Sequence, residues 1–284
     1  MLKLFNEISF KTSSLITNSY STSFSSAVSL LDRESQDAIY SIYGFVRFAD
    51  EIVDSLHDFD KKELLEKFER DYYDAVEKGI SLNPVLNSFQ ITVRKYNIPD
   101  GLIQAFLTSM KTDLIKQNHV SESETNSYIY GSAEVVGLMC LKVFVNGDEK
   151  LYNELEIPAR KLGSAFQKVN FLRDIKTDTE FLNRQYFYHL SEKGFTDEVK
   201  NRIADDIENE FNTSMDGLKR LPDKVKPGVL IAHMYFRRLL HIIRKTPAKT
   251  LMSKRIRVPD RIKLMLLLKA YLTCRLRLPA ISKN

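Results

Sequence analysis

Glycine and proline are scarce in this chain, and that scarcity limits the available folds more than any other feature of the sequence. The 284 residues include only ten Gly and eight Pro, about half of the usual combined share of roughly 12%. Sandwiches and barrels built from many short strands need frequent tight turns, which these residues normally supply. Apolar residues instead recur every three or four positions, as at Ile39, Ile42, Val46 and Val53. We therefore predict one all-α domain spanning residues 1–284.

The sequence also marks several helix boundaries. Asp32 and Ser35 stand at the start of the helical pattern of residues 36–56, where short polar side chains cap free backbone N–H groups. The pair Asn146-Gly147 is more typical of a turn between two helices than of a hairpin, since no alternating strand pattern flanks it. Residues 135–141 are apolar on all sides, which predicts a helix buried in the middle of the bundle.

Cysteine usage and apolar run lengths indicate a cytoplasmic protein. Cys140 and Cys274 lie far apart in apolar settings, so we expect reduced, buried thiols rather than a disulfide framework. The first ten residues contain no sustained apolar stretch of the kind found in secretory signals. The longest strictly apolar run near the C-terminus, Leu264 to Leu268, is far shorter than the roughly 20 residues that span a bilayer. We expect no membrane-spanning segment.

The mild net charge of +5 conceals a basic C-terminal segment. Residues 237–277 carry thirteen Lys or Arg and one acid, Asp260, so the local charge is +12 and the rest of the chain sums to −7. The basic residues alternate with aliphatic side chains rather than with aromatic residues that stack on bases. This pattern argues against a nucleic-acid partner. It favours peripheral contact with anionic lipid headgroups, which we carry forward as a hypothesis.

Two helical stripes of oxygen-bearing side chains are the strongest functional signal. Asp50 and Asp54 are four residues apart and share one helix face, with Arg47 one turn earlier. A second stripe runs along another apolar helix at steps of three, four and four residues. Its members are Gln167, Asn170, Asp174 and Asp178.

Either stripe alone is most often a solvated helix face, but two of them on apolar helices indicate a shared site. Facing each other across a bundle, the stripes would present hard oxygen ligands, which suit Mg²⁺ completed by water and substrate phosphates. Such ions favour ionisation of a diphosphate without a side-chain nucleophile. A di-iron centre fits less well, because no His stands at the Glu-x-x-His spacing. The sequence also has no Cys/His zinc pattern, Gly-rich phosphate loop or Gly-x-Ser-x-Gly elbow.

These motifs resemble those of the head-to-head trans-isoprenyl diphosphate synthases, namely the squalene, dehydrosqualene and phytoene synthases. The resemblance covers most of the chain and implies an isoprenoid-synthase-type helical bundle around a central active-site cavity. The matching segments are Tyr20-Ser21-Thr22-Ser23-Phe24, Ile42 to Asp54, Tyr130-Gly131, Val136-Gly137-Leu138-Met139, Leu162 to Asp174, Asp178 and Arg184-x-Tyr186-Phe187.

The resemblance implies a role for each matching residue. Mg²⁺, with Mn²⁺ as the alternative ion, would be held by Asp50, Glu51, Asp54, Asn170, Asp174 and Asp178. Prenyl diphosphate substrates would contact Ser21, Ser23, Phe24, Arg47, Gln167, Arg173, Arg184 and Tyr186, with Phe24 at the mouth of the prenyl channel. The carbocations would form beside Tyr43, Tyr130 and Tyr235.

Three positions depart from the family pattern. Glu51 stands where a second consecutive Asp is usual, and Thr177 stands where a Glu commonly precedes the last Asp. Glu134 replaces a small Gly in an otherwise apolar helix. We expect Glu134 either to pair with a basic side chain or to alter the pocket.

Within the family, the segment Val136-Gly137-Leu138-Met139 is more similar to phytoene synthases than to dehydrosqualene synthases. The sequence as a whole resembles the bacterial 15-cis-phytoene synthases, particularly those of the Bacteroidetes type. That resemblance implies condensation of two geranylgeranyl diphosphates, no NADPH, and handover to downstream carotenoid enzymes. Squalene or dehydrosqualene synthesis from farnesyl diphosphate is the alternative. A non-catalytic assembly factor of the same fold fits less well, since Asp50, Asp54, Asp174 and Asp178 are all retained.

Overall fold

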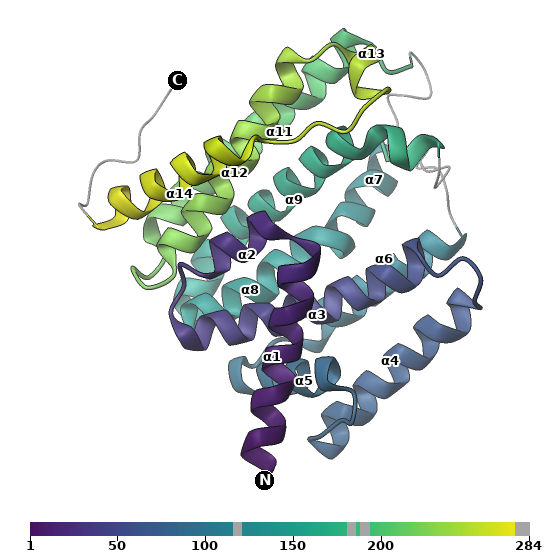
Figure 1. Cartoon of the computed structure of the whole chain (residues 1–284), viewed down its shortest axis with the longest axis vertical. Coiled ribbons are helices and arrows are strands. Elements are labelled where there is room, and N and C mark those ends of the chain that lie inside the picture. Colours follow the sequence, from purple (N-terminus) through teal and green to yellow (C-terminus); the bar gives the residue numbers. More distant parts are fainter. Residues whose placement is uncertain (116–120, 181–185, 188–193, 276–284) are drawn as a thin grey trace.

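The computed structural model describes residues 1–115, 121–180, 186–187 and 194–275 (Figure 1). Within these residues every regular element is a helix, so the predicted all-α fold class is confirmed. The elements are α1 (Leu2–Tyr20), α2 (Thr22–Val28), α3 (Arg33–Asp54), α4 (Lys61–Lys78), α5 (Pro84–Tyr96), α6 (Asp100–Ile115), α7 (Glu122–Ile129), the π-helix η1 (Tyr130–Glu134), α8 (Val135–Val145), α9 (Glu149–Glu180), α11 (Asp197–Arg220), α12 (Lys226–Lys245), α13 (Ala248–Leu251) and α14 (Asp260–Arg275).

The predicted helix boundaries agree with the structure. The side chain of Asp32 accepts a hydrogen bond from the Ser35 backbone N–H at 3.2 Å and begins α3. Helix α8 ends at Val145, its C-cap Asn146 has a left-handed φ of 47°, and Gly147 follows with φ of 89°. Asn and Gly tolerate this conformation better than other residues. The pair therefore forms the predicted turn from α8 into α9.

Helix α8 connects the two parts of the bundle. It packs on α3 and α6 on one side and on α9 on the other. Figure 1 shows α9, α11, α12 and α14 in the upper part of the view, α1, α4 and α5 in the lower part, and α3, α6 and α8 in the middle. Leu138, Met139 and Leu141 are buried, which confirms the prediction of a central apolar helix. Both acidic stripes lie on helices that contact α8.

Glycines bring η1 and α8 unusually close to α9. A Cβ atom on Gly163 would lie 2.7 Å from the carbonyl oxygen of Ala133, and one on Gly137 would lie 3.0 Å from that of Ala159. Both neighbours are backbone atoms of the facing helix, so they cannot rotate away as a side chain would. The close approach therefore requires glycine at both positions.

One continuous helical stretch of the described chain, Glu122–Val145, is long and apolar enough to cross a membrane. It comprises α7, η1 and α8, and 56% of its most apolar window is buried inside the protein. Its α8 part packs on α3, α6 and α9, as expected for a core helix. Packing within the bundle thus accounts for its hydropathy.

Candidate active site

The first acidic stripe lies in the last turn of α3. Arg47 Nη1 donates to Asp50 Oδ2 at 2.7 Å, and the same guanidinium binds Glu51. The helix ends at Asp54 and has no basic residue in its last turn. Unsatisfied carbonyl groups make this end of a helix negative, and Lys61 Nζ donates to the Val53 carbonyl there at 2.8 Å. The acids of this stripe therefore lie beside two basic side chains, Arg47 and Lys61.

Aromatic and hydroxyl side chains from α1, α2 and α3 surround Arg47. Its guanidinium lies 4.3 Å from the ring centroid of Tyr20, and Phe24 stacks on Tyr43 with centroids 4.9 Å apart. Ser21 Oγ accepts the Phe24 backbone N–H and caps α2. Burial raises the pKa of Tyr43 above its ordinary value, although the Arg47 charge opposes the shift. The structure therefore brings Ser21, Phe24, Tyr43 and Arg47 together beside Asp50.

The second stripe lies on α9, and two arginines hold its central carboxylate. Arg173 Nε donates to Asp174 Oδ1 at 3.0 Å, and Arg255 Nε donates to the same oxygen at 2.6 Å. Arg255 comes from the connection between α13 and α14 and was not among the predicted site residues. Its only sequence signal was the excess of basic residues in segment 237–277. The basic segment thus meets the acidic stripe at Asp174.

The carboxylates do not form a preassembled metal cage. Among the residues that the structure describes, no three Asp, Glu, His or Cys side chains lie close enough to share one ion. Mg²⁺ usually takes only one or two carboxylates, with water and substrate phosphates as further ligands, so a closed cluster is not required. Within the described structure, the buried Asn170 Oδ1 has no hydrogen-bond partner, and an unused buried acceptor is costly. These donors fit a hard cation, and the Mg²⁺ assignment stays a prediction.

Ser23 and Tyr235 meet at a pocket of about 200 Å³ between α2, α12 and α14. Lys263 and Leu264 of α14 also line this pocket. Tyr235 packs edge-on against Phe236, with ring centroids 5.5 Å apart. The pocket therefore joins two predicted site residues to the C-terminal helix.

Tyr186 lies in a buried aromatic stack. Its ring is 4.1 Å from that of Phe171 and 5.1 Å from that of Tyr128, measured between centroids. Thr125 Oγ1 donates to the Tyr186 backbone carbonyl at 2.9 Å, which fixes this segment against α7. The predicted phosphate contact of Tyr186 stays a prediction, and Arg184 lies outside the described residues.

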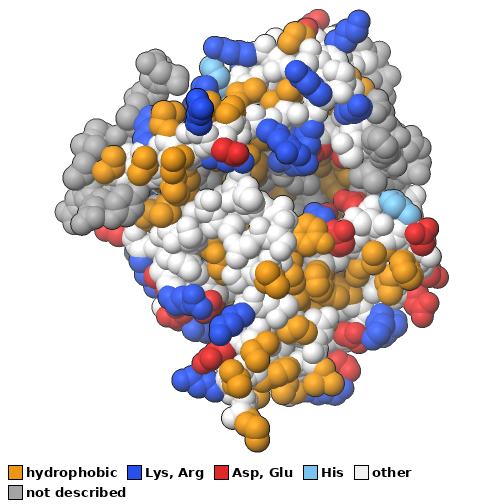
Figure 2. All heavy atoms as spheres, viewed as in Figure 1, with side chains coloured by type: hydrophobic (Ala, Val, Ile, Leu, Met, Phe, Trp, Pro, Cys, Tyr) orange, Lys and Arg blue, Asp and Glu red, His pale blue; other side chains and the backbone are white. Residues whose placement is uncertain are grey.

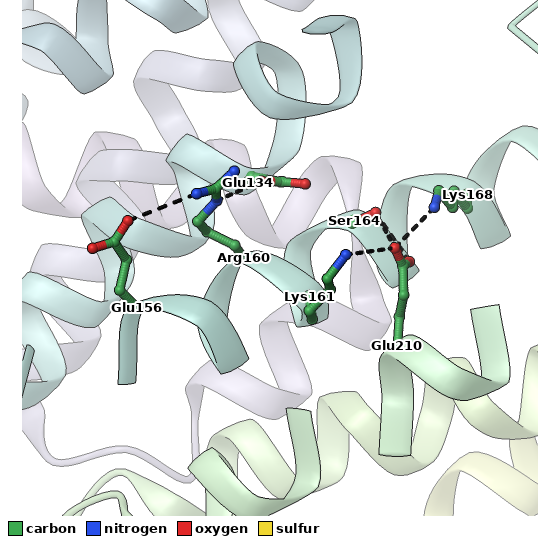
Figure 3. A network of polar contacts seen from close by, with 7 residues as sticks. All are labelled: Glu134, Glu156, Arg160, Lys161, Ser164, Lys168 and Glu210. Carbon is green, nitrogen blue, oxygen red and sulfur yellow. Dashed lines mark hydrogen bonds and ion pairs between the residues drawn. The ribbon is translucent and has the colours of Figure 1, made fainter. Parts of the chain in front are cut away.

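Tyr130 is the first residue of η1, and a basic side chain of α9 lies over its ring. The Cζ atom of Arg160 is 5.1 Å from the Tyr130 centroid. Arg160 Nε also donates to Glu134 Oε2 at 2.7 Å (Figure 3). The structure thus confirms the expectation that Glu134 pairs with a basic side chain.

A second polar cluster fixes α9 to α11. Glu210 of α11 accepts hydrogen bonds from Ser164 at 3.0 Å and from Lys168 at 2.8 Å, both on α9 (Figure 3). The Glu210 side chain is only 10% exposed, and buried charges are tolerated when they are paired in this way. The contacts hold α9 from the side of α11, adjacent to the helix segment that carries Gln167 and Asn170.

Figure 2 shows one face of the molecule hollowed between the upper and lower groups of helices. Basic and acidic side chains gather on the rim of this hollow. A rim that carries charge of both signs is of the kind that a diphosphate and its counter-ions require.

The chain is similar to known proteins over most of its length. A family model described as squalene/phytoene synthase matches residues 17–261. A phytoene synthase of Pseudescherichia vulneris is 26% identical over 243 residues, covering 77% of each chain. A phytoene synthase of Mycobacterium tuberculosis is 24% identical, covering 85% of this chain and 84% of the relative. The solved structure of a dehydrosqualene synthase superposes with a TM-score of 0.81 at 22% identity, covering 95% of this chain and 98% of the other.

Proposed function

Because this chain belongs to the squalene/phytoene synthase family, and is therefore a prenyltransferase that joins prenyl diphosphates head to head, we propose that it makes 15-cis-phytoene from geranylgeranyl diphosphate. The observation that carries the proposal is the similarity to curated phytoene synthases over about four fifths of the chain. The dehydrosqualene synthase structure supports the shared fold and leaves the donor length open.

The proposed reaction has two steps. One geranylgeranyl diphosphate loses diphosphate, and its allylic cation alkylates the 2,3-double bond of a second molecule. Loss of a proton closes the cyclopropane of prephytoene diphosphate. This intermediate loses its own diphosphate, rearranges, and loses a second proton to give phytoene. The net products are phytoene, two diphosphates and two protons, so no reductant such as NADPH is needed.

The two acidic stripes are proposed to bind the diphosphate end of the substrate. Asp50, Glu51 and Asp54 on α3, and Asn170, Asp174 and Asp178 on α9, would hold Mg²⁺ or Mn²⁺. The bound ions supply charge neutralisation for the departing diphosphate. Arg47 and Arg173 now pair with carboxylates of these stripes. We propose that they turn to diphosphate oxygens, whose geometry suits the guanidinium fork.

The aromatic residues are proposed to protect the carbocations. Phe24 stacks on Tyr43 next to Arg47, where the ring faces would stabilise an allylic cation by about 0.5–2 kcal/mol each. Tyr130 and Tyr235 would serve in the same way. A site lined by such rings also excludes water, which would otherwise quench the cation.

Substrate turnover tests this proposal directly. Purified protein with Mg²⁺ should convert geranylgeranyl diphosphate to phytoene, detected by chromatography. Conversion of farnesyl diphosphate alone would contradict the twenty-carbon assignment and support squalene or dehydrosqualene synthesis. Failure with both substrates would contradict catalysis and support a non-catalytic assembly role.

We also propose that α14 contacts an anionic membrane. Leu264, Met265, Leu268 and Leu272 are each 48–60% exposed and recur on one face of this helix. Exposed basic residues at 254, 257, 261 and 269 flank this face. Figure 2 shows hydrophobic side chains gathered over this helix. The surface would suit a cytoplasmic enzyme whose apolar product passes to downstream carotenoid enzymes in the bilayer.

Vesicle sedimentation tests the membrane proposal. The protein should sediment with vesicles rich in phosphatidylglycerol and less with pure phosphatidylcholine. Leu268→Gln should weaken binding, whereas Leu82→Gln, which alters a 91% exposed leucine between α4 and α5, should not. Equal binding of all three proteins would contradict the assignment of α14.

A further inference from the structure

The Glu134–Arg160 ion pair lies beside Tyr130, a predicted catalytic ring, and has no role in the reaction proposed above. Arg160 lies seven residues before Gln167, which is two helical turns, so both lie on the same face of α9. The separation along the helix is about 10 Å. Arg160 therefore lies on the same face of α9 as the proposed diphosphate ligands, on their N-terminal side.

A positive charge on this face of α9 is unfavourable for the proposed chemistry. Carbocations repel a guanidinium, and Arg160 is within 5.1 Å of the ring that would stabilise them. Glu134 removes this difficulty, because its carboxylate binds Arg160 Nε at 2.7 Å. The Glu134 side chain is 13% exposed and the Arg160 side chain 40% exposed, so solvent screens the pair in part, as for charges near a protein surface.

The backbone explains why Glu134 reaches this position. Glu134 is the last residue of η1 and Tyr130 the first, so one turn of π-helix carries both the ring and the acid. Gly163 lets this turn approach α9, since its missing Cβ would lie 3.2 Å from the Glu134 Cα. Figure 3 shows Arg160 between Glu134 on one side and Glu156 on the other.

We propose that Glu134 is a positioning residue whose ion pair holds Arg160 against the Tyr130 ring and cancels its positive charge, leaving the ring available to a carbocation. The proposal rests on the proposed role of Tyr130. Arg160 lies 5.1 Å from the centroid of the Tyr130 ring. A carbocation on the opposite face can lie up to about 6 Å from the same centroid, so the two positive charges would be about 11 Å apart. If Glu134 no longer neutralises Arg160, the two charges repel each other. At an effective dielectric constant of about 20, this repulsion corresponds to about a tenfold loss of rate or affinity.

Four variants separate charge compensation from packing. Glu134→Gln keeps the shape but exposes the Arg160 charge, and should lower kcat about tenfold with little change in KM. In the double variant Glu134→Gln/Arg160→Gln, kcat should return to within about threefold of wild type, because the guanidinium charge is gone. The single variant Arg160→Gln instead leaves the Glu134 carboxylate without this partner. Glu156→Gln is the matched control: Glu156 is 3.8 Å from the same guanidinium but 42% exposed, so kcat should change less than twofold.

A binding measurement tests the same idea without turnover. The probe is a geranylgeranyl chain with a permanently charged trimethylammonium head, compared with its uncharged carbon isostere by calorimetry. Glu134→Gln should weaken the charged probe about tenfold and the neutral probe less than twofold. Equal weakening of both probes, or a double variant no better than Glu134→Gln, would overturn the proposal.

The outcome for wild type distinguishes this inference from the proposed function. If wild type binds neither probe and turns over neither prenyl diphosphate, the proposed function fails. If wild type is active and Glu134→Gln matches it in kcat and probe affinity, only the role of Glu134 fails. Thermal melts followed by circular dichroism identify any variant that has lost its fold.

Discussion

Replacing Gly163 by Ala should disrupt the closest contact between α9 and η1. The added Cβ would lie 2.7 Å from the Ala133 carbonyl oxygen and 3.2 Å from the Glu134 Cα. Because both contacts are with backbone, α9 must move away from η1 or a main-chain segment must distort. Overpacking of this kind typically costs about 1–3 kcal/mol.

Gly101→Ala provides the matched control. A Cβ at Gly101 meets nothing within 4 Å, and the residue lies in the first turn of α6. Both substitutions gain the helix propensity of Ala, up to about 1 kcal/mol, so their difference isolates the packing cost. That difference should be about 1–3 kcal/mol, or roughly 2–12 °C in Tm for a chain of this size.

Calorimetric melts of the two variants and wild type measure this difference. We expect Gly163→Ala to melt below Gly101→Ala and to lose turnover, because displacement of α9 also moves the acidic stripe relative to α3. Equal Tm values for the two variants would refute the argument that α9 and η1 are held at backbone contact.

Three further predictions concern charge. Asp50→Asn and Asp174→Asn should each lower turnover at least about 100-fold while helix content by circular dichroism is unchanged, and wild-type rates would contradict the metal assignment. Burial lowers the pKa of His233 to about 4, below an unfolded value near 6.5. As pH falls, the unfolded chain therefore binds this proton before the folded chain does, which destabilises the fold. The free energy of unfolding, measured by urea titration, should fall by up to about 3 kcal/mol between pH 6.5 and 4. In a His233→Asn variant this part of the decrease should disappear. Glu210→Gln leaves a largely buried lysine without its acid and should cost about 2–3 kcal/mol, whereas Glu154→Gln, in a more exposed ion pair between the same two helices, should cost less than about 1 kcal/mol.

The features that sequence predicts well are those set by neighbouring residues. The Asp32 cap of α3 depends on contacts within three residues, and the turn at Asn146-Gly147 depends on the conformations that these two residues tolerate. The shared face of Asp174 and Asp178 follows from helical spacing alone.

The features that sequence does not predict depend on contacts between distant segments. Arg255 reaches Asp174 across 81 residues, and no local pattern distinguishes it from the other basic residues of its segment. Arg237 and Arg244 of α12 pair with Glu208 and Asp205 of α11. Part of the positive charge of residues 237–277 is therefore neutralised by acids of α11. Counting charges along the sequence could not reveal this pairing.

The π-helix η1 also constrains how the length of this chain can vary. A π-helical turn contains one residue more than the α-helical pattern requires. Deleting a residue between Tyr130 and Glu134 would let α7 and α8 run on as an ordinary α-helix. However, each residue of an α-helix turns the chain by about 100°, so the faces of α7 and α8 could no longer both keep their present neighbours. Homologous chains should thus tolerate insertions and deletions in the loops far more readily than in this single turn.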